Sequence, residues 1–139
     1  MKKLTMALLT TMAFSAQAAE LATFPEAANA VAQGKQLTFV WKIKECTSEQ
    51  KLPEMVSSIK PNAVMLINNR AITASDRHFT INDPFQPGQP VFDYTKHVLT
   101  ADGQAGLHVT VMRASDYSIV KEFQVDCELG KGLQIFVQD

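Results

Sequence analysis

The stretch VFDYTKHVLTADGQAGLHVTVMRASDYSIVKEFQV, residues 91–125, decides the fold because its apolar residues recur with a period of two. Such alternation is typical of half-buried β-strands, whose side chains point to opposite faces in turn. Turn-forming residues interrupt it at Asp102-Gly103 and again at residues 114–116. The pattern therefore predicts an antiparallel meander with strands over residues 91–100, 106–113, 117–126 and 133–137.

The turn at Asp102-Gly103 fixes how the first two of these strands pair. This dipeptide favours a two-residue hairpin turn, which places His97 directly opposite His108, with Cβ atoms about 4.5–5.5 Å apart. A four-residue turn would keep the same faces and shift the partners. In either case the apolar face carries Phe92, Tyr94, Val98, Leu107, Val109 and Val111, and the polar face carries Asp93, Thr95, His97, His108 and Thr110.

The third strand adds a carboxylate to the two histidines. A three-residue turn at residues 114–116 places Glu122 opposite His108 and directs the apolar residues of this strand, Tyr117, Ile119, Phe123 and Val125, to the apolar face. Two imidazoles and a carboxylate suit zinc or non-haem iron, so His97, His108 and Glu122 form a candidate metal site. Against it, the outer two of three strands lie about 9.5 Å apart. A solvated polar face, with His108 paired to Glu122, accounts for the same residues.

The remaining segments complete a mainly β chain. Residues 23–34, TFPEAANAVAQG, predict one helix, because Thr23 and Glu26 have capping-box spacing and Gly34 is placed to end it. Residues 37–43 alternate as a strand that ends near Cys46. The other segments are predicted as a loop with room for one helical turn over 47–62, a strand covered on both faces over 63–67, an Asn-Asn turn at 68–69, a strand over 78–82 and a loop over 83–90. We therefore expect a curved antiparallel sheet or small barrel with one N-terminal helix.

The N-terminus predicts export. Lys2 and Lys3 precede a short apolar run and the small-residue site Ala16–Ala18, which together indicate a signal peptide over residues 1–18. Residues 19–139 would then form a single β-rich domain with no membrane span. The expected location is the periplasm, with secretion beyond it left open.

The charge of the mature chain excludes one class of partner. The leader carries two of the 13 basic residues and none of the 14 acidic residues, so the mature chain has a net charge of −3. Its lysines are also scattered, whereas nucleic-acid binding requires a clustered basic surface. We therefore expect no nucleic-acid partner.

The two cysteines predict a disulfide. Cys46 and Cys127 are the only cysteines of the chain, and both lie in its exported part. Closing so long a loop lowers the conformational entropy of the unfolded chain, which stabilises the fold by roughly 4 to 5 kcal/mol. The alternative, a pair of reactive or metal-binding thiols, lacks a CxxC spacing.

Catalytic motifs are absent from the sequence. It contains no GxSxG elbow, HExxH helix or glycine-rich dinucleotide turn. His78 follows Ser75 and Asp76, but residues so close in sequence rarely have triad geometry, and a turn histidine with a local hydrogen bond explains it. We therefore assign no catalytic residue and expect no cofactor.

Four segments resemble the VirK family of small exported bacterial proteins linked to virulence. They are LTFVWKIKECT, ITASDRHFTIN, PVFDYTKHVLTADG and CELGKGLQIFV, and the resemblance extends from about Phe24 to Val137. It implies a virulence-associated factor, and it supplies no catalytic residues to carry over.

Three hypotheses for the function follow. The leading one is a non-enzymatic binding protein that acts on a protein or cell-envelope partner in the periplasm or outside the cell. The second is a carrier of a small apolar ligand in a β-barrel cavity lined by Phe39, Trp41, Phe79, Phe92, Tyr94 and Phe123. The third is a metal-dependent hydrolase that uses the His97, His108 and Glu122 row. We assign no oligomeric state and no ligand-binding residues.

Overall fold

The computed structural model describes residues 18–138, so the predicted signal peptide lies outside the described residues except for Ala18. The helical elements are α1 (Phe24–Ala32) and the 3₁₀ turn η1 (Ile43–Glu45). The strands are β1 (Ala19–Glu20), β2 (Leu37–Lys42), β3 (Val56–Ile59), β4 (Ala63–Ile67), β5 (Ala71–Thr80), β6 (Val91–Thr100), β7 (Gln104–Arg113), β8 (Ile119–Leu129) and β9 (Gly132–Val137).

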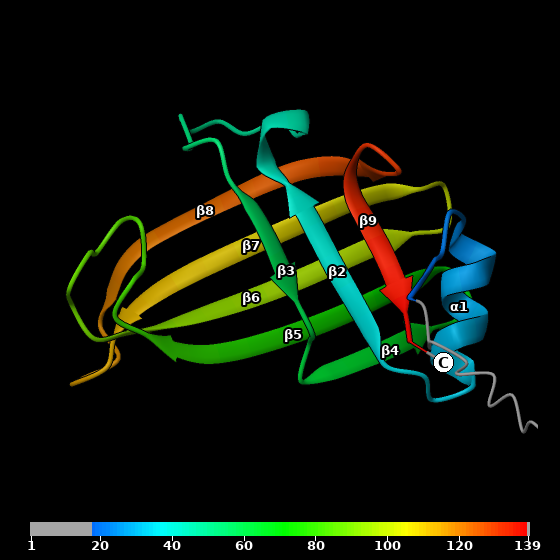
Figure 1. The fold of residues 1–139 in the computed structure, drawn as a ribbon, viewed down its shortest axis with the longest axis horizontal. Coiled ribbons are helices and arrows are strands. Elements are labelled where there is room, and N and C mark those ends of the chain that lie inside the picture. Colours follow the sequence, from blue (N-terminus) through cyan, green and yellow to red (C-terminus); the bar gives the residue numbers. More distant parts are fainter. Residues whose placement is uncertain (1–17, 139) are drawn as a thin grey trace, which may run out of the picture.

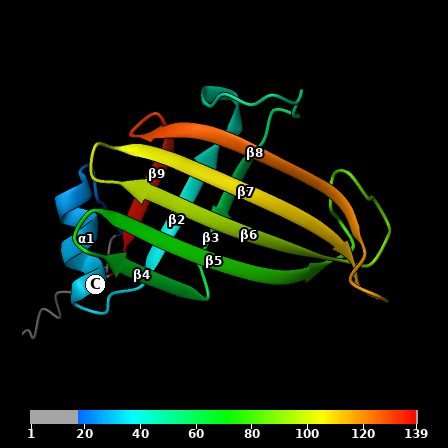
Figure 2. The same ribbon diagram turned by 180° about the vertical axis from the view of Figure 1, so that it is seen from behind.

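All strands belong to one curled sheet. Its order is β3-β2-β9-β8-β7-β6-β5-β4, and β1 pairs with β9 at the side of this path. The long strands β5–β8 form one layer, and β2, β3 and β9 cross over its concave face, with α1 at one end (Figure 1). Seen from behind, β5–β8 cover the other three strands (Figure 2). The end strands β3 and β4 are not neighbours in the sheet, so the predicted curved sheet is confirmed as an open half-barrel. Its pairs are antiparallel as predicted, except for a short parallel pairing of β8 with β9.

The N-terminal helix has the predicted caps. The Thr23 side chain accepts a hydrogen bond from the Glu26 backbone N–H, and the Glu26 carboxylate accepts one from the Thr23 N–H. These contacts satisfy donors that the first helical turn leaves free. Gly34, at a φ of 71°, follows the C-cap and takes the left-handed conformation that ends helices. Phe24 and Ala27 bury the inner face of the helix.

The core lies between the two layers. Residues Leu37, Phe39 and Trp41 of β2 point inward as their alternation predicts, and each is at most 3% exposed. They face apolar side chains of the long strands and of β9, including Leu99, Leu107, Val111, Val125, Leu133 and Ile135.

The predicted register between β6 and β7 is wrong by one residue. His97 pairs with Leu107, and Lys96 pairs with His108, because the turn spans three residues, Ala101–Gly103. Gly103 adopts a φ of 86°, and its N–H donates to the Thr100 carbonyl. This glycine conformation lengthens the turn, and a slip of one residue changes which face a strand presents.

The slip reverses the predicted faces of β6. Asp93, Thr95 and His97 point into the half-barrel, whereas Phe92, Tyr94 and Val98 point outward. The inward assignment of Leu107, Val109 and Val111 in β7 is correct. Polar side chains therefore stand where the alternation placed the tyrosine and a valine.

The pairing of β8 also differs from the prediction. The turn before it is one residue longer than predicted, because the Arg113 N–H donates to the Ser118 carbonyl, and a β-bulge between Val111 and Met112 adds one more residue of shift. Glu122 therefore lies opposite Thr110 instead of His108. Phe123 and Val125 point inward as predicted. Tyr117 lies in the turn before β8, Ile119 pairs with Met112 on the turn side of the bulge, and both are exposed.

Three smaller predictions are corrected on the edge of the sheet. The segment predicted as a loop over 47–62 contains β3, and β5 begins at Ala71 instead of residue 78. β4 is an end strand with Met65 and Ile67 exposed, so it is not covered on both faces. The predicted Asn-Asn turn before β5 is correct, with φ values of 50° and 52° at Asn68 and Asn69.

Candidate functional site

The three predicted metal ligands do not meet. His97 is 1% exposed inside the half-barrel, whereas His108 lies on the outer face of the neighbouring strand, opposite Gln124. His108 Nε2 is 3.8 Å from Glu122 Oε1, so these two form an exposed pair without His97. Within residues 18–138, no group of three His, Cys, Asp or Glu side chains is arranged to hold a metal ion.

His97 instead joins the two layers of the fold. Trp41 Nε1–H donates to His97 Nδ1 across 3.0 Å, so the other ring nitrogen carries the proton and donates to Thr95 Oγ1, also at 3.0 Å. Burial lowers the pKa of His97 to about 4, which keeps the ring neutral. The Phe39 ring lies 5.1 Å from the imidazole centroid. This histidine has a structural role.

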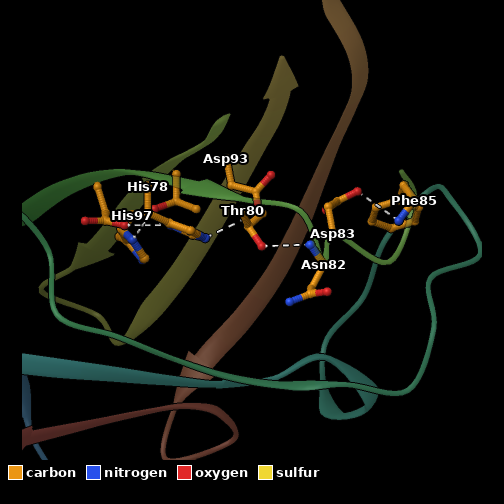
Figure 3. A network of polar contacts seen from close by, with 9 residues as sticks. His78, Thr80, Asn82, Asp83, Phe85, Asp93 and His97 are labelled. Carbon is orange, nitrogen blue, oxygen red and sulfur yellow. Dashed lines mark hydrogen bonds and ion pairs between the residues drawn. The ribbon is translucent and has the colours of Figure 1, made fainter. Parts of the chain in front are cut away.

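A second histidine, His78, lies among acidic side chains farther along β5 and β6, and Figure 3 shows it close to His97. His78 Nδ1–H donates to Asp76 Oδ2 at 3.0 Å, and His78 Nε2–H donates to Asp93 Oδ2 at 3.3 Å. The hydrogen bond to Asp93, followed by the one to Asp76, outweighs partial burial and raises the pKa of His78 to about 9. His78 is therefore an imidazolium at neutral pH.

Asp83 brings a third carboxylate to this region. It lies in the loop between β5 and β6, is 5% exposed, and accepts a hydrogen bond from the Phe85 N–H at 2.9 Å. Burial raises the pKa of Asp83, and the negative charge of Asp93 adds to this effect. Asp93 Oδ1 is itself buried and has no hydrogen-bond partner. Within residues 18–138, His78 is the one cationic side chain paired with Asp76 and Asp93. With Asp83 nearby, the cluster has more negative than positive groups.

These groups line a small pocket, which we term the acidic pocket. It has a volume of about 220 Å³ and lies between β3, the loop over residues 81–90 and the concave face of the long strands. Asp83, Asp93 and His78 are its charged lining residues. The apolar lining includes Met55, Ile59, Phe85, Val109 and Phe123. The rings of Phe85 and Phe123 have centroids 5.4 Å apart.

The local sequence explains how the pocket forms. His78 pairs with Asp93 across β5 and β6, and Asp76 pairs with Thr95, so alternation directs all four toward the concave face. The loop that follows β5 begins with a turn in which Thr80 Oγ1 accepts from the Asn82 N–H. Sequence reasoning missed Asp93 because the predicted register assigned it to a solvated face. It missed Asp83 because only the tertiary fold brings the loop of this residue to the pocket.

The predicted disulfide is confirmed. Cys46 and Cys127 are bonded, with Cα atoms 4.6 Å apart and a sequence separation of 81. The bond ties the segment after η1 to β8. Gly132 lies against it: a Cβ atom there would meet Cys46 Sγ at 2.6 Å and Cys127 Cβ at 2.9 Å. The glycine is therefore required by the space that the disulfide occupies.

The aromatic lining predicted for a carrier is not formed. Phe39 and Trp41 fill the core, and Phe123 is the one member of the predicted set that lines the acidic pocket. The others lie on the outer face, where Phe79 packs at the edge of the Phe92 ring and Arg77 lies 5.1 Å over it.

Comparisons with known proteins agree on one family. A family model described as VirK protein matches residues 20–117. A solved structure, that of lpg1832, a VirK family protein from Legionella pneumophila, is 46% identical, covers 84% of this chain and 98% of its own, and has a TM-score of 0.80. The protein y4wH from Sinorhizobium fredii, described as uncharacterized, is 26% identical over 120 residues, which are 84% of this chain and 81% of that relative.

Proposed function

This chain belongs to the VirK family, and we propose that it is an exported, non-enzymatic binding protein that takes part of a protein or cell-envelope partner into the acidic pocket. The observation that carries the proposal is the combination of an apolar pocket with more carboxylates than cations on its wall. A concave, mostly apolar site with a few convergent polar groups is the usual form of a binding site.

The protonation of His78 favours binding over acid–base catalysis. Both of its ring nitrogens donate to carboxylates, and its pKa is raised to about 9. A general base must accept a proton near the working pH, which this imidazolium cannot do at neutral pH. The pocket therefore supplies charge and shape without a proton acceptor at His78.

The size of the pocket favours a partner over a carried ligand. Pockets that bury drug-sized ligands have volumes of about 300–1,000 Å³, and this one has about 220 Å³. A single side chain or a small headgroup fits such a volume. The pocket would then recognise one group of a larger partner.

The disulfide and the predicted leader support export. Structural disulfides persist in oxidising compartments, and the bond between Cys46 and Cys127 closes most of the chain. Within residues 18–138, no helix is long and apolar enough to cross a membrane. Cell fractionation with N-terminal sequencing tests export: a periplasmic or secreted chain that begins at Ala19 is expected, and an uncleaved cytoplasmic chain would contradict it.

Binding at the pocket is tested with small probes of different charge. We expect n-butylammonium to shift the NMR signals of Met55, Phe85 and Val109, whereas n-butanol and n-butyrate leave them unchanged. Asp93→Asn should abolish the response, and Glu128→Gln, an exposed acid on β8 outside the pocket, should retain it. Equal responses to the three probes, or turnover that His78→Ala abolishes, would contradict the proposal.

A further inference from the structure

We infer that the acidic pocket and the free edge of β3 form one site, which binds an extended segment of a partner protein by strand addition and takes a lysine or arginine side chain into the pocket. This inference rests on the proposed function above and names the occupant of the same site.

The edge of β3 is open for pairing. β3 is the end strand of the sheet and pairs with β2 on one side only, through the register from Phe39 and Ile59 to Lys42 and Val56. The backbone N–H and C=O groups on its other side therefore have no strand partner. Val56, the first residue of β3, is 67% exposed, so the start of this strand is not covered by other parts of residues 18–138.

The pocket lies beside this free edge. Ser57, Ser58 and Ile59 of β3 line it, and no residue of β2 does. The opposite wall comes from the loop containing Asp83 and Phe85. Figure 1 shows β3 crossing over the long strands, with this loop beyond it on the side away from β2. An added strand would occupy this opening.

The geometry of strand addition would deliver a side chain into the pocket. A strand that pairs with β3 lies about 4.8 Å from it, and its side chains point alternately to the two faces. Every second residue would then face the concave side, where the pocket opens. In recognition of this type the backbone supplies affinity, and pockets for alternate side chains supply specificity.

The chemistry of the wall selects a cation on an apolar stem. Asp93 Oδ1 is buried without a partner, and Asp83 is 5% exposed, so both carboxylates lack the solvation that an exposed acid has. The methylenes of lysine or arginine would pack on Met55 and Phe123, while the charged end reaches the acids. Phe85 adds apolar surface to the same wall, and its ring already holds the Lys121 ammonium, with Nζ 5.5 Å from the centroid.

Short capped peptides test the charge requirement. Peptides of alternating threonine and valine are prepared with lysine, norleucine or glutamate at one central position, and binding to the mature protein is measured by fluorescence polarisation. We expect the lysine peptide to bind at least about tenfold more tightly than the norleucine peptide, and the glutamate peptide to bind least. In Asp83→Asn and in Asp93→Asn the preference for lysine over norleucine should fall to about threefold or less, whereas Glu128→Gln should keep it.

N-methylation of the lysine peptide tests strand addition. Methyl groups are placed on the amide nitrogens of one alternate set of residues or of the other. Because one set faces β3 and the other faces solvent, one methylated peptide should lose binding by at least about tenfold and the other should not. NMR shifts should fall on residues 56–59 and not on residues 63–67, the other end strand.

The outcomes separate this inference from the proposed function. Equal affinity for the lysine and norleucine peptides would show that the pocket does not select a cationic side chain. Equal effects of the two methylation patterns would rule out strand addition. If n-butylammonium binds and none of the peptides does, the pocket is a binding site and the inferred occupant is wrong. Binding to vesicles that contain phosphatidylethanolamine is measured as well. If the protein binds these vesicles and none of the peptides, the pocket recognises a lipid headgroup and the inferred peptide occupant is wrong. Asp83→Asn keeps an acceptor for the Phe85 N–H, so this variant tests the charge even if Asp93→Asn fails to fold.

Discussion

Trp41 of β2 donates its indole N–H to His97 Nδ1 of β6 across 3.0 Å, and this contact joins the two layers of the half-barrel at the centre of the core. The acceptor must be a neutral imidazole, because a protonated one has no lone pair to offer. The stability of the fold is therefore coupled to the protonation state of one side chain.

The free energy of unfolding should fall as the pH falls from 6.5 toward 4. The pKa of His97 is lowered to about 4 in the folded protein, whereas an unfolded histidine has a pKa near 6.5, so the unfolded state binds more protons in this window. The contribution is complete above pH 6.5 and is lost as the pH approaches 4, at no more than about 1.4 kcal/mol per pH unit. Urea titrations of the wild type and of His97→Gln measure it. The slope of the free energy of unfolding against pH gives the number of protons taken up on unfolding, and in His97→Gln this number should be smaller by about one. Equal slopes in the two proteins would contradict the assignment.

Removing the imidazole should be costly at neutral pH as well. His97→Leu leaves the Trp41 indole N–H and the Thr95 hydroxyl buried without partners, which destabilises the protein by about 2–4 kcal/mol. The matched control is His108→Leu on the exposed face, with an expected change within about 0.5 kcal/mol. Chemical denaturation of both variants gives the comparison. Similar losses in the two would show that burial of His97 is not what matters.

The same contact explains why the sequence predicted the strand β6 but not which of its faces is buried. Along β6, the set containing Phe92, Tyr94 and Val98 is the more apolar, so alternation alone directs it inward. The structure buries the other set because His97 accepts a hydrogen bond from Trp41, 56 residues earlier in the chain, and Asp93 pairs with His78 on the adjacent strand. Partners so distant in sequence leave no local signal.

Two of the local signals succeeded, whereas the Asp102-Gly103 turn was predicted one residue too short. The capping box of Thr23 and Glu26 and the Asn68-Asn69 turn depend on neighbours within a few residues, and both were predicted correctly. The acidic pocket depends instead on where the loop of Asp83 and Phe85 lies relative to β3, which only the tertiary fold determines.

His78 should titrate far above the usual range for histidine. Its pKa is raised to about 9, first by the hydrogen bond to Asp93, so its ring signals should change between about pH 8 and 10 in an NMR titration. Because the folded pKa lies above the unfolded one, the stabilisation from His78 is present below pH 6.5 and is lost as the pH rises through 9. Asp93→Asn should lower the titration midpoint, and Glu128→Gln should leave it unchanged. A midpoint near 6.5 in the wild type would show that the carboxylates do not hold the ring.

Replacing either cysteine of the disulfide should lower the free energy of unfolding by the same amount. Cys46→Ser and Cys127→Ser each open the same loop, so each should lower the free energy of unfolding by a similar amount, up to about 4 to 5 kcal/mol. Thermal denaturation with and without reductant measures the effect. Reductant should destabilise the wild type and leave both serine variants unchanged. Clearly different losses in the two variants would mean that one cysteine has a further role.

Gly132 should be required both for its backbone conformation and for the space that the disulfide occupies. Comparison with Gly130 separates these two effects. Gly130 has a φ of 86° and open space where a methyl group would stand, so Gly130→Ala reports backbone strain alone, at about 1 kcal/mol. Gly132 has a φ of 90°, and a Cβ atom there would overlap Cys46 Sγ and Cys127 Cβ, so Gly132→Ala carries the same strain together with a steric clash against the disulfide. We expect Gly132→Ala to lose about 2–4 kcal/mol or to leave free thiols, counted by reaction with a thiol reagent, whereas Gly130→Ala should oxidise fully. If the two variants lost the same stability and both formed the disulfide, the backbone conformation alone would account for the glycine.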